Sequence, residues 1–277
     1  SGDTIGFTLA GTVPWYSSSY SCKTESGSVS LWNQAASVAK SKLGYVAGKN
    51  NHLVLFFPSN IDCAGSIGLG SVGVSANTGG VAWVRGTDAP VEQASLAHEL
   101  GHNMSLGHAD WMLCSSATPN PGFLGTTGCT KYDYGDATDV MGFGTTGKTG
   151  GALSAPQAIR AGIWPSNAWE TMLAGTTSRT INTVASNTGL RGLVVQDDNG
   201  VNYFIEYRNF DDEDAQYLGG SCTTSCVAPT GGVRVMRLEN TGYKFASVPN
   251  GFLGFPGDDS YLMGRTISAT PTSNLTN

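Results

Sequence analysis

The chain has 277 residues, of which 40% are hydrophobic and only 13% are charged, so it can bury a sizeable core with about half the usual share of charges. Its formal net charge is −6, and no run of Lys and Arg offers the basic surface that nucleic acid requires. No apolar stretch approaches the ~20 residues that span a bilayer. We therefore expect neither a nucleic-acid partner nor a membrane span.

The first part of the sequence predicts alternating strands and helices. Short apolar runs indicate strands at residues 12–16, 53–57 and 80–86. Residues 29–43 repeat apolar side chains at nearly helical period, and Gly44 follows as a natural stop. These patterns predict a mixed α/β layout for this part of the chain.

The middle of the chain contains two further predicted helices. The first covers residues 90–104, with Asp88 as its cap and Pro90 in its first turn. Residues 109–151 are rich in Gly, Thr and Pro, and we expect few regular elements there. A capping serine and an early proline then predict a helix at 154–163.

The sequence becomes strand-like after about residue 175. Turn residues separate the apolar runs 180–184, 192–196, 202–207 and 232–238. The prediction is an α+β protein with one domain at 1–174 and a β-rich domain at 175–277. We expect the second domain to be a β-sandwich.

Six cysteines allow 15 pairings into three disulfides. Because sequence neighbours often pair, we predict Cys22–Cys63, Cys114–Cys129 and Cys222–Cys226. Zinc ligation by the last pair is the alternative, but no second Cys or His pair lies nearby. Disulfides form in oxidising compartments, so we expect a secreted protein, and without a signal peptide at Ser1 we expect a mature or trimmed form.

One segment carries the predicted chemistry. His98 and His102 stand four residues apart, which places both imidazoles on one helix face, and Glu99 lies one step round beside them. This is the H-E-x-x-H arrangement of zinc peptidases, in which the glutamate is the general base. Core histidines are common on apolar helix faces, but three of the four histidines here fall at ligand spacing. His52 is the fourth, and we assign it no role.

A third ligand is needed to close the site. His108 follows His102 by six residues, so the chain must bend between them for His108 to reach the same ion. Three neutral imidazoles leave a fourth tetrahedral position for water. The predicted reaction is peptide hydrolysis by a metal-activated water, with Glu99 as general base. Asp110 is the rival ligand, or else a buried hydrogen-bonded brace.

The extended motif resembles that of the metzincin metalloproteases, whose pattern H-E-x-x-H-x-x-G-x-x-H precedes a methionine turn. Residues 139–142 (Asp-Val-Met-Gly) look like that turn. Within the metzincins, H-E-L-G-H-N-x-x-L-G-H-A and the stretch 134–142 are most similar to the gametolysin family. Residues 153–156, 161–164 and 204–208 look similar again.

The resemblance implies a two-part catalytic domain. One part carries a twisted sheet and the active-site helix, with residues 80–86 as the edge strand that binds substrate in extended form. The other part carries the methionine turn and the helix after it. Zinc would lie in the cleft between them, with Met141 as an apolar floor beneath the metal.

The sequence departs from the family pattern in two places. Ser105 occupies the position of the glycine that normally allows a left-handed turn, at a cost on the order of 1 kcal/mol. Phe143 replaces the tyrosine that serves some metzincins as a fifth ligand. Tyr132 and Tyr134 could reach the cleft and assist the oxyanion, or serve only in packing.

The leading hypothesis is therefore a secreted, monomeric zinc endopeptidase, with one catalytic Zn²⁺ on His98, His102 and His108, that acts on protein or peptide substrates. Two alternatives stay open: a zinc amidase acting on cell-wall peptides, and an inactive binding or adhesion module on a protease scaffold. The acidic runs 211–214 and 258–259 could bind Ca²⁺ or form solvated loops.

Overall fold

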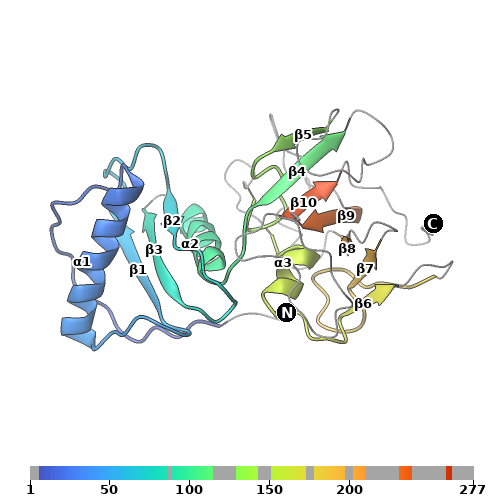
Figure 1. The fold of residues 1–277 in the computed structure, drawn as a ribbon, viewed down its shortest axis with the longest axis horizontal. Coiled ribbons are helices and arrows are strands. Elements are labelled where there is room, and N and C mark those ends of the chain that lie inside the picture. The colour runs from blue at the N-terminus through green and yellow to red at the C-terminus, as the bar shows by residue number, and fades with distance from the viewer. Residues whose placement is uncertain are drawn as a thin grey trace. The chain divides into compact units, whose positions relative to one another are not determined.

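The computed structural model describes residues 6–86, 89–114, 129–142, 151–172, 178–196, 202–209, 231–238 and 260–263. The chain forms two compact units, Ile5–Ser105 and Leu106–Asn277, which are drawn in Figure 1. The first holds α1 (Glu25–Leu43), β1 (His52–Phe57), β2 (Gly68–Gly70), β3 (Gly80–Arg85) and α2 (Ala89–Asn103). The second holds β4 (Ala109–Cys114), β5 (Cys129–Tyr132), α3 (Ala155–Arg160), β6 (Trp169–Met172), β7 (Gly192–Gln196), β8 (Asn202–Arg208), β9 (Gly232–Leu238) and β10 (Ser260–Met263).

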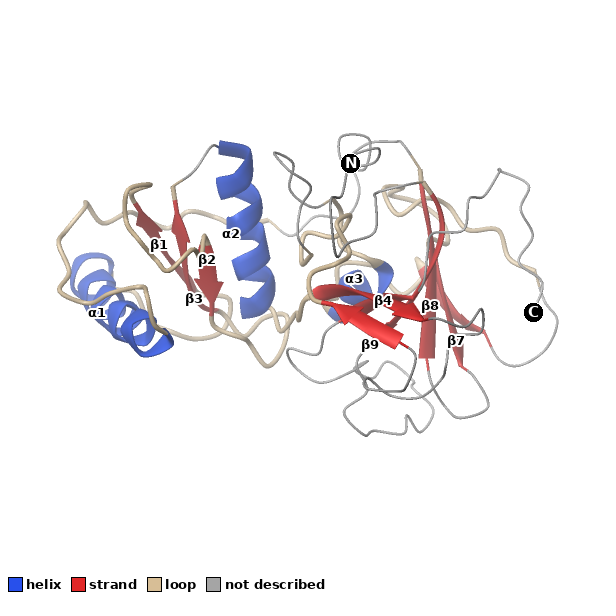
Figure 2. Ribbon diagram, turned by 90° about the horizontal axis from the view of Figure 1, so that it is seen from above, coloured by secondary structure: helices blue, strands red, loops and turns tan. Residues whose placement is uncertain are grey.

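The first unit is a small sheet between two helices, with α1 on one face and α2 on the other (Figure 2). Side chains alternate between the faces, as a strand requires. Leu69 and Trp83 lie opposite each other and pack in the core that Leu31 of α1 completes. Gly70 and Ala82 are the next pair, and they face α2 with almost no side chain. This small-residue face lets α2 approach the sheet closely.

Helix α1 begins earlier than predicted. Thr24 caps it by accepting a hydrogen bond from the Gly27 backbone N–H, so the helix starts at Glu25 and not at residue 29. It ends as predicted, with Gly44 in the left-handed conformation at φ 69°. A disulfide joins Cys22, just before the helix, to Cys63, and confirms that predicted pairing.

The order of the small sheet is β1-β3-β2, with β1 parallel and β2 antiparallel to β3. Strand β3 is therefore central, and the prediction that residues 80–86 form the edge strand is wrong. The three-residue strand β2 is the edge beside α2. Two of its residues are glycines, which give no strand signal in the sequence.

The second unit is built on a seven-stranded sheet in the order β5-β4-β10-β9-β8-β7-β6. Strands β7, β8, β9 and β10 form an antiparallel succession, while β10 pairs with β4 and β6 with β7 in parallel. Its apolar core joins residues of the sheet to α3 and the following loop, namely Trp111, Ala155, Ala158, Trp164, Ala168, Val184, Val194, Phe204, Met236 and Leu238.

Several sequence predictions fail in detail. Residues 12–16 are not a strand, and Trp15 is 73% exposed. Residues 180–184 are not a strand either, since only an isolated bridge joins Thr183 to Tyr207. Residues 109–151 hold two strands, β4 and β5, where few regular elements were expected. Strands β6 and β10 were also not predicted.

The predicted domain boundary between residues 174 and 175 differs from the division into compact units, which follows Ser105. Strands from both sides of residue 175 share the seven-stranded sheet. The described strands confirm a mixed α/β protein with more than one sheet, but they do not confirm a β-sandwich. No described helix is both long enough and apolar enough to cross a bilayer.

Candidate metal centre

The three predicted histidines come together. His98 and His102 lie one turn apart on α2, with ring centroids 4.8 Å apart in an edge-to-face arrangement. The potential ligand atoms of His98, His102 and His108 all lie within 4.8 Å of one another. No other group of three or more His, Cys, Asp or Glu side chains with such geometry occurs in the described ranges.

The bend that the spacing requires is present. Helix α2 ends at Asn103, and Ser105 takes the left-handed conformation at φ 74°, as predicted for the glycine position. The Ser105 N–H donates to the carbonyl of His102 at 2.9 Å. Ser105 is fully buried, and its hydroxyl has no hydrogen-bond partner among the described residues.

Asn103 fixes the end of α2 to the sheet. Its Nδ2 donates to the Ser71 carbonyl at 2.8 Å, and its Oδ1 lies 3.1 Å from Nδ1 of His52. The Gly73 N–H also donates to the His102 carbonyl at 2.8 Å. No role was predicted for Asn103 or His52, because nothing in the local sequence indicates that an amide at a helix end contacts a distant strand.

Glu99 is held against the edge strand β2. The Gly70 N–H donates to its carboxylate, and the side chain is only 7% exposed. Burial raises the pKa of Glu99 to about 8, although the Gly70 hydrogen bond acts in the opposite direction. A Cβ at Gly68 would lie 2.5 Å from Oε1 of Glu99. The glycine is therefore what leaves room for this carboxylate.

His108 is half-buried and has defined neighbours within the second unit. Its ring lies 3.9 Å from that of Tyr134, measured between centroids. Gln157 of α3 donates from Nε2 to the carbonyls of Gly107 at 3.0 Å and His108 at 3.4 Å. Tyr132 differs from Tyr134, since it stacks on Trp111 at 4.8 Å and serves in packing.

Asp110 is not part of the histidine cluster, and its carboxylate instead contacts residues near His108. It is fully buried, accepts the Tyr134 N–H at 2.7 Å and pairs with Lys131 at 3.0 Å. These contacts use the carboxylate to fix the backbone near His108, consistent with the non-ligand alternative in the sequence analysis.

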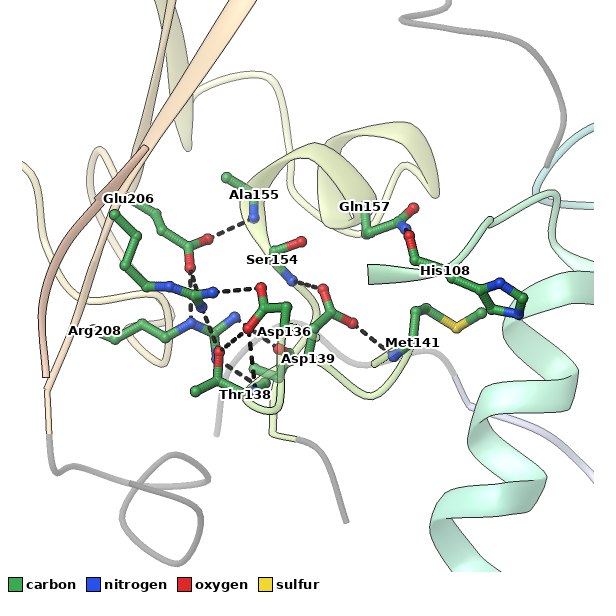
Figure 3. A network of polar contacts seen from close by, with 12 residues as sticks. His108, Asp136, Thr138, Asp139, Met141, Ser154, Ala155, Gln157, Glu206 and Arg208 are labelled. Atoms are coloured by element: carbon green, nitrogen blue, oxygen red, sulfur yellow. Dashed lines mark hydrogen bonds and ion pairs between the residues drawn. The ribbon is translucent and has the colours of Figure 1, made fainter. Parts of the chain in front are cut away.

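Met141 is fully buried, and its side chain points toward the His108 ring (Figure 3). Its carbonyl accepts a hydrogen bond from Ala109 at 2.8 Å, which ties it to the residue after His108. The next residue must be glycine, because a Cβ at Gly142 would lie 1.9 Å from the Asp136 carbonyl oxygen.

A buried charge cluster of Asp136, Glu206, Arg208 and Arg234 holds the loop of residues 136–142 from the side of the sheet. Figure 3 labels Asp136, Glu206 and Arg208 of this cluster. Arg234 of β9 pairs with Asp136 and, at 3.0 Å, with Glu206 of β8. Arg208 binds Glu206 at 2.7 Å and donates to the Thr138 carbonyl at 3.2 Å. All four charged side chains are almost completely buried, which is tolerable because each is paired.

Asp139 joins the turn to the start of α3. Its carboxylate accepts the backbone N–H groups of Met141 and Ser154, both at 2.7 Å. Burial raises its pKa to about 6, and the neighbouring charge of Asp136 adds to this effect. Asp136 behaves differently: burial alone would raise its pKa, but Arg234 and Arg208 hold it below the ordinary value.

Several predicted features fall outside the description. These are the Cys222–Cys226 pair, the acidic runs 211–214 and 258–259, the Asp88 cap and Phe143. The backbones of Cys114 and Cys129 lie opposite each other in the β4–β5 register, but their side chains are not described.

Three imidazoles around one point, with a carboxylate beside them, form a donor set suited to a catalytic zinc ion. A sequence model of the Reprolysin-like metallo-peptidase family M12B matches residues 1–109, and so ends just after His108. No curated protein and no solved structure matches the chain. The family match and the histidine cluster together support a metzincin-like zinc protease.

Proposed function

We propose that this chain is a secreted zinc-dependent endopeptidase in which His98, His102 and His108 hold the metal and Glu99 is the general base. The observation that carries the proposal is the convergence of the three imidazole rings. The match to a metallopeptidase family over the same residues supports it independently.

The residues fit a zinc ion in type and number. Neutral imidazole nitrogens are preferred zinc ligands, and three of them leave one position open, as catalytic sites require. A zinc ion bound there would supply a Lewis acid that makes water a stronger nucleophile and polarises a peptide carbonyl. Proton transfer and substrate binding are then carried out by residues of this chain.

Glu99 has the position and the chemistry of the general base. It follows His98 directly, so its carboxylate lies beside the imidazoles without joining their cluster. The carboxylate would take a proton from water and later give it to the leaving amine. The Gly70 N–H restricts where that carboxylate can lie. A bound cation would lower the pKa of Glu99 and favour its ionised form.

Strand β2 is the proposed substrate-binding edge. It pairs with β3 on one side, and no other described strand pairs with it. An extended peptide could add to its free edge through backbone hydrogen bonds. This role replaces the one predicted for residues 80–86. The glycines of β2 also bring this edge next to Glu99.

Finer parts of the proposal rest on the sequence motifs. The stretches 98–109 and 134–142 favour a gametolysin-like peptidase, with Met141 as the apolar floor of its methionine turn. The Cys22–Cys63 disulfide supports an extracellular location. We retain 1–174 as the proposed protease domain, 175–277 as the β-rich domain, and a monomeric state.

The test is digestion of casein by four preparations with measured zinc content. Wild type and Glu92→Ala, which alters another glutamate of α2, should digest casein. Chelated wild type and Glu99→Ala should not, although Glu99→Ala should retain zinc because it keeps all three imidazoles. A loss on the order of 10²–10⁴-fold is expected for a missing general base.

The same preparations separate the competing hypotheses. Zinc-dependent digestion that survives Glu99→Ala would refute the assigned mechanism. A zinc-containing wild type that cleaves peptidoglycan peptides but not casein would favour the amidase. A wild type that binds zinc and cleaves neither would favour the binding module.

A further inference from the structure

The backbone of Tyr134 has an unusual conformation at a position next to the metal centre. Its φ is 58°, in the left-handed region that bulky side chains rarely adopt. The Tyr134 N–H donates to the buried carboxylate of Asp110 at 2.7 Å, and this contact holds the residue in place. Such strain persists only where surrounding contacts enforce it, and it is concentrated at functional sites.

The enforced conformation places the Tyr134 ring on His108. The centroids are 3.9 Å apart and the planes are inclined by 39°. Tyr132, only two residues earlier, faces Trp111 instead. Tyr132, the last residue of β5, packs on Trp111 in the core. The left-handed backbone at Tyr134 directs its ring to His108 instead.

Gln157 holds the backbone of the same histidine. It is fully buried, and its Nε2 donates to the carbonyls of Gly107 and His108. Figure 3 shows this amide directed at the His108 backbone from α3. The start of α3 is itself fixed, because Glu206 accepts the Ala155 N–H at 2.6 Å. The amide therefore comes from an anchored helix.

We propose that Tyr134 and Gln157 are positioning residues that hold the ring and the backbone of His108 in the orientation required for metal binding. His108 needs such support because it lies beyond the end of α2, whereas His98 and His102 are held by the helix itself. Residues that orient a metal ligand typically contribute 10–100-fold to metal affinity. This inference rests on the proposed function, since it takes His108 as a ligand.

The experiment measures zinc affinity by competition with a chromophoric chelator, so the readout does not depend on catalysis. Tyr134→Leu and Gln157→Leu should each bind zinc roughly 10–100-fold more weakly than wild type. Tyr134→Phe keeps the ring and should bind within about threefold of wild type. Tyr132→Leu is the matched control: it removes a packed aromatic ring and should leave zinc affinity unchanged.

Replacement of zinc by Co²⁺ gives a second readout. Tyr134→Leu and Gln157→Leu should shift the visible absorption bands of the cobalt protein, because the third imidazole is reoriented, whereas Tyr132→Leu should not. If Gln157→Leu does not fold, Gln157→Asn replaces it, because the shorter amide cannot reach the Gly107 carbonyl.

The outcomes distinguish this inference from the proposed function. A wild type that binds no zinc overturns both. A wild type that binds zinc, with unchanged affinity and cobalt spectra in both positioning variants, overturns only the roles of Tyr134 and Gln157. Equal weakening in Tyr132→Leu would show that general packing, and not the orientation of His108, sets the affinity.

Discussion

Replacement of Ser105 by glycine should stabilise the protein, although this residue lies two positions beyond the end of α2, which carries His98 and His102. Two costs are present at this position. A side chain in the left-handed conformation costs roughly 1–2 kcal/mol. The buried Ser105 hydroxyl, which has no partner in the described part of the chain, costs roughly 1–3 kcal/mol. Glycine removes both but loses about 0.5–1 kcal/mol through the greater freedom of the unfolded chain. The expected net gain is about 1–4.5 kcal/mol.

Two further variants separate these contributions. Ser105→Ala removes only the hydroxyl and should be less stable than Ser105→Gly by about 0.5–1 kcal/mol. Ala64→Gly is the matched control, because Ala64 is exposed, has φ 56° and lacks a hydroxyl. The free energy of unfolding of Ala64→Gly should rise only by the conformational contribution, about 0.5–1 kcal/mol.

The assay is urea unfolding of chelated protein in a Glu99→Ala background, which prevents self-digestion. Thermal unfolding should agree, with a shift of about 2–4 °C per kcal/mol. If Ser105→Gly is no more stable than Ser105→Ala, the left-handed backbone at residue 105 is not strained. Both variants at or below the wild-type stability would show that the hydroxyl is satisfied.

Three other predictions follow from the contacts. Gly68→Ala should lower kcat/KM for a peptide by roughly 10²–10⁴-fold with zinc retained, because the new Cβ displaces the carboxylate of Glu99, the proposed general base; Gly6→Ala, with open space around it, should have no effect. Since the folded-state pKa of Asp139 is about 6, above its unfolded value, the folded state keeps a proton that the unfolded chain releases. The free energy of unfolding should therefore decrease as the pH rises from about 4 to 6, and Asp139→Asn should remove that decrease. An identical slope in Asp139→Asn would refute the assignment. Asp136→Asn and Arg234→Met should each cost about 3–5 kcal/mol in urea unfolding, and the double variant should cost less than their sum; strict additivity would show that the pair does not interact.

The sequence predicted the local features of the site well. The histidine pair, the following bend and the left-handed serine all depend on helix geometry within a few residues, so spacing is sufficient to infer them. Strands β7 and β9 were predicted with the observed bounds because each has a dense apolar run. The Cys22–Cys63 pairing was also predicted correctly.

Long-range features could not be predicted in the same way. Strand β2 has two glycines in three residues, and without it β3 was mistaken for the edge. The support of His108 by Gln157 joins residues 49 positions apart, and the Arg234–Asp136 pair spans 98 positions. Nothing local marks such partners, because a buried charge and a solvated charge look alike in sequence.

The charge cluster has a consequence for the ionic conditions in which the protein can work. Dissolved ions weaken only the charge pairs that they can approach. The exposed Arg179–Glu170 pair is accessible to them. Arg208, Arg234 and their carboxylate partners are buried. Their contacts with the loop of residues 136–142 should therefore be as strong at high salt concentration as in dilute buffer.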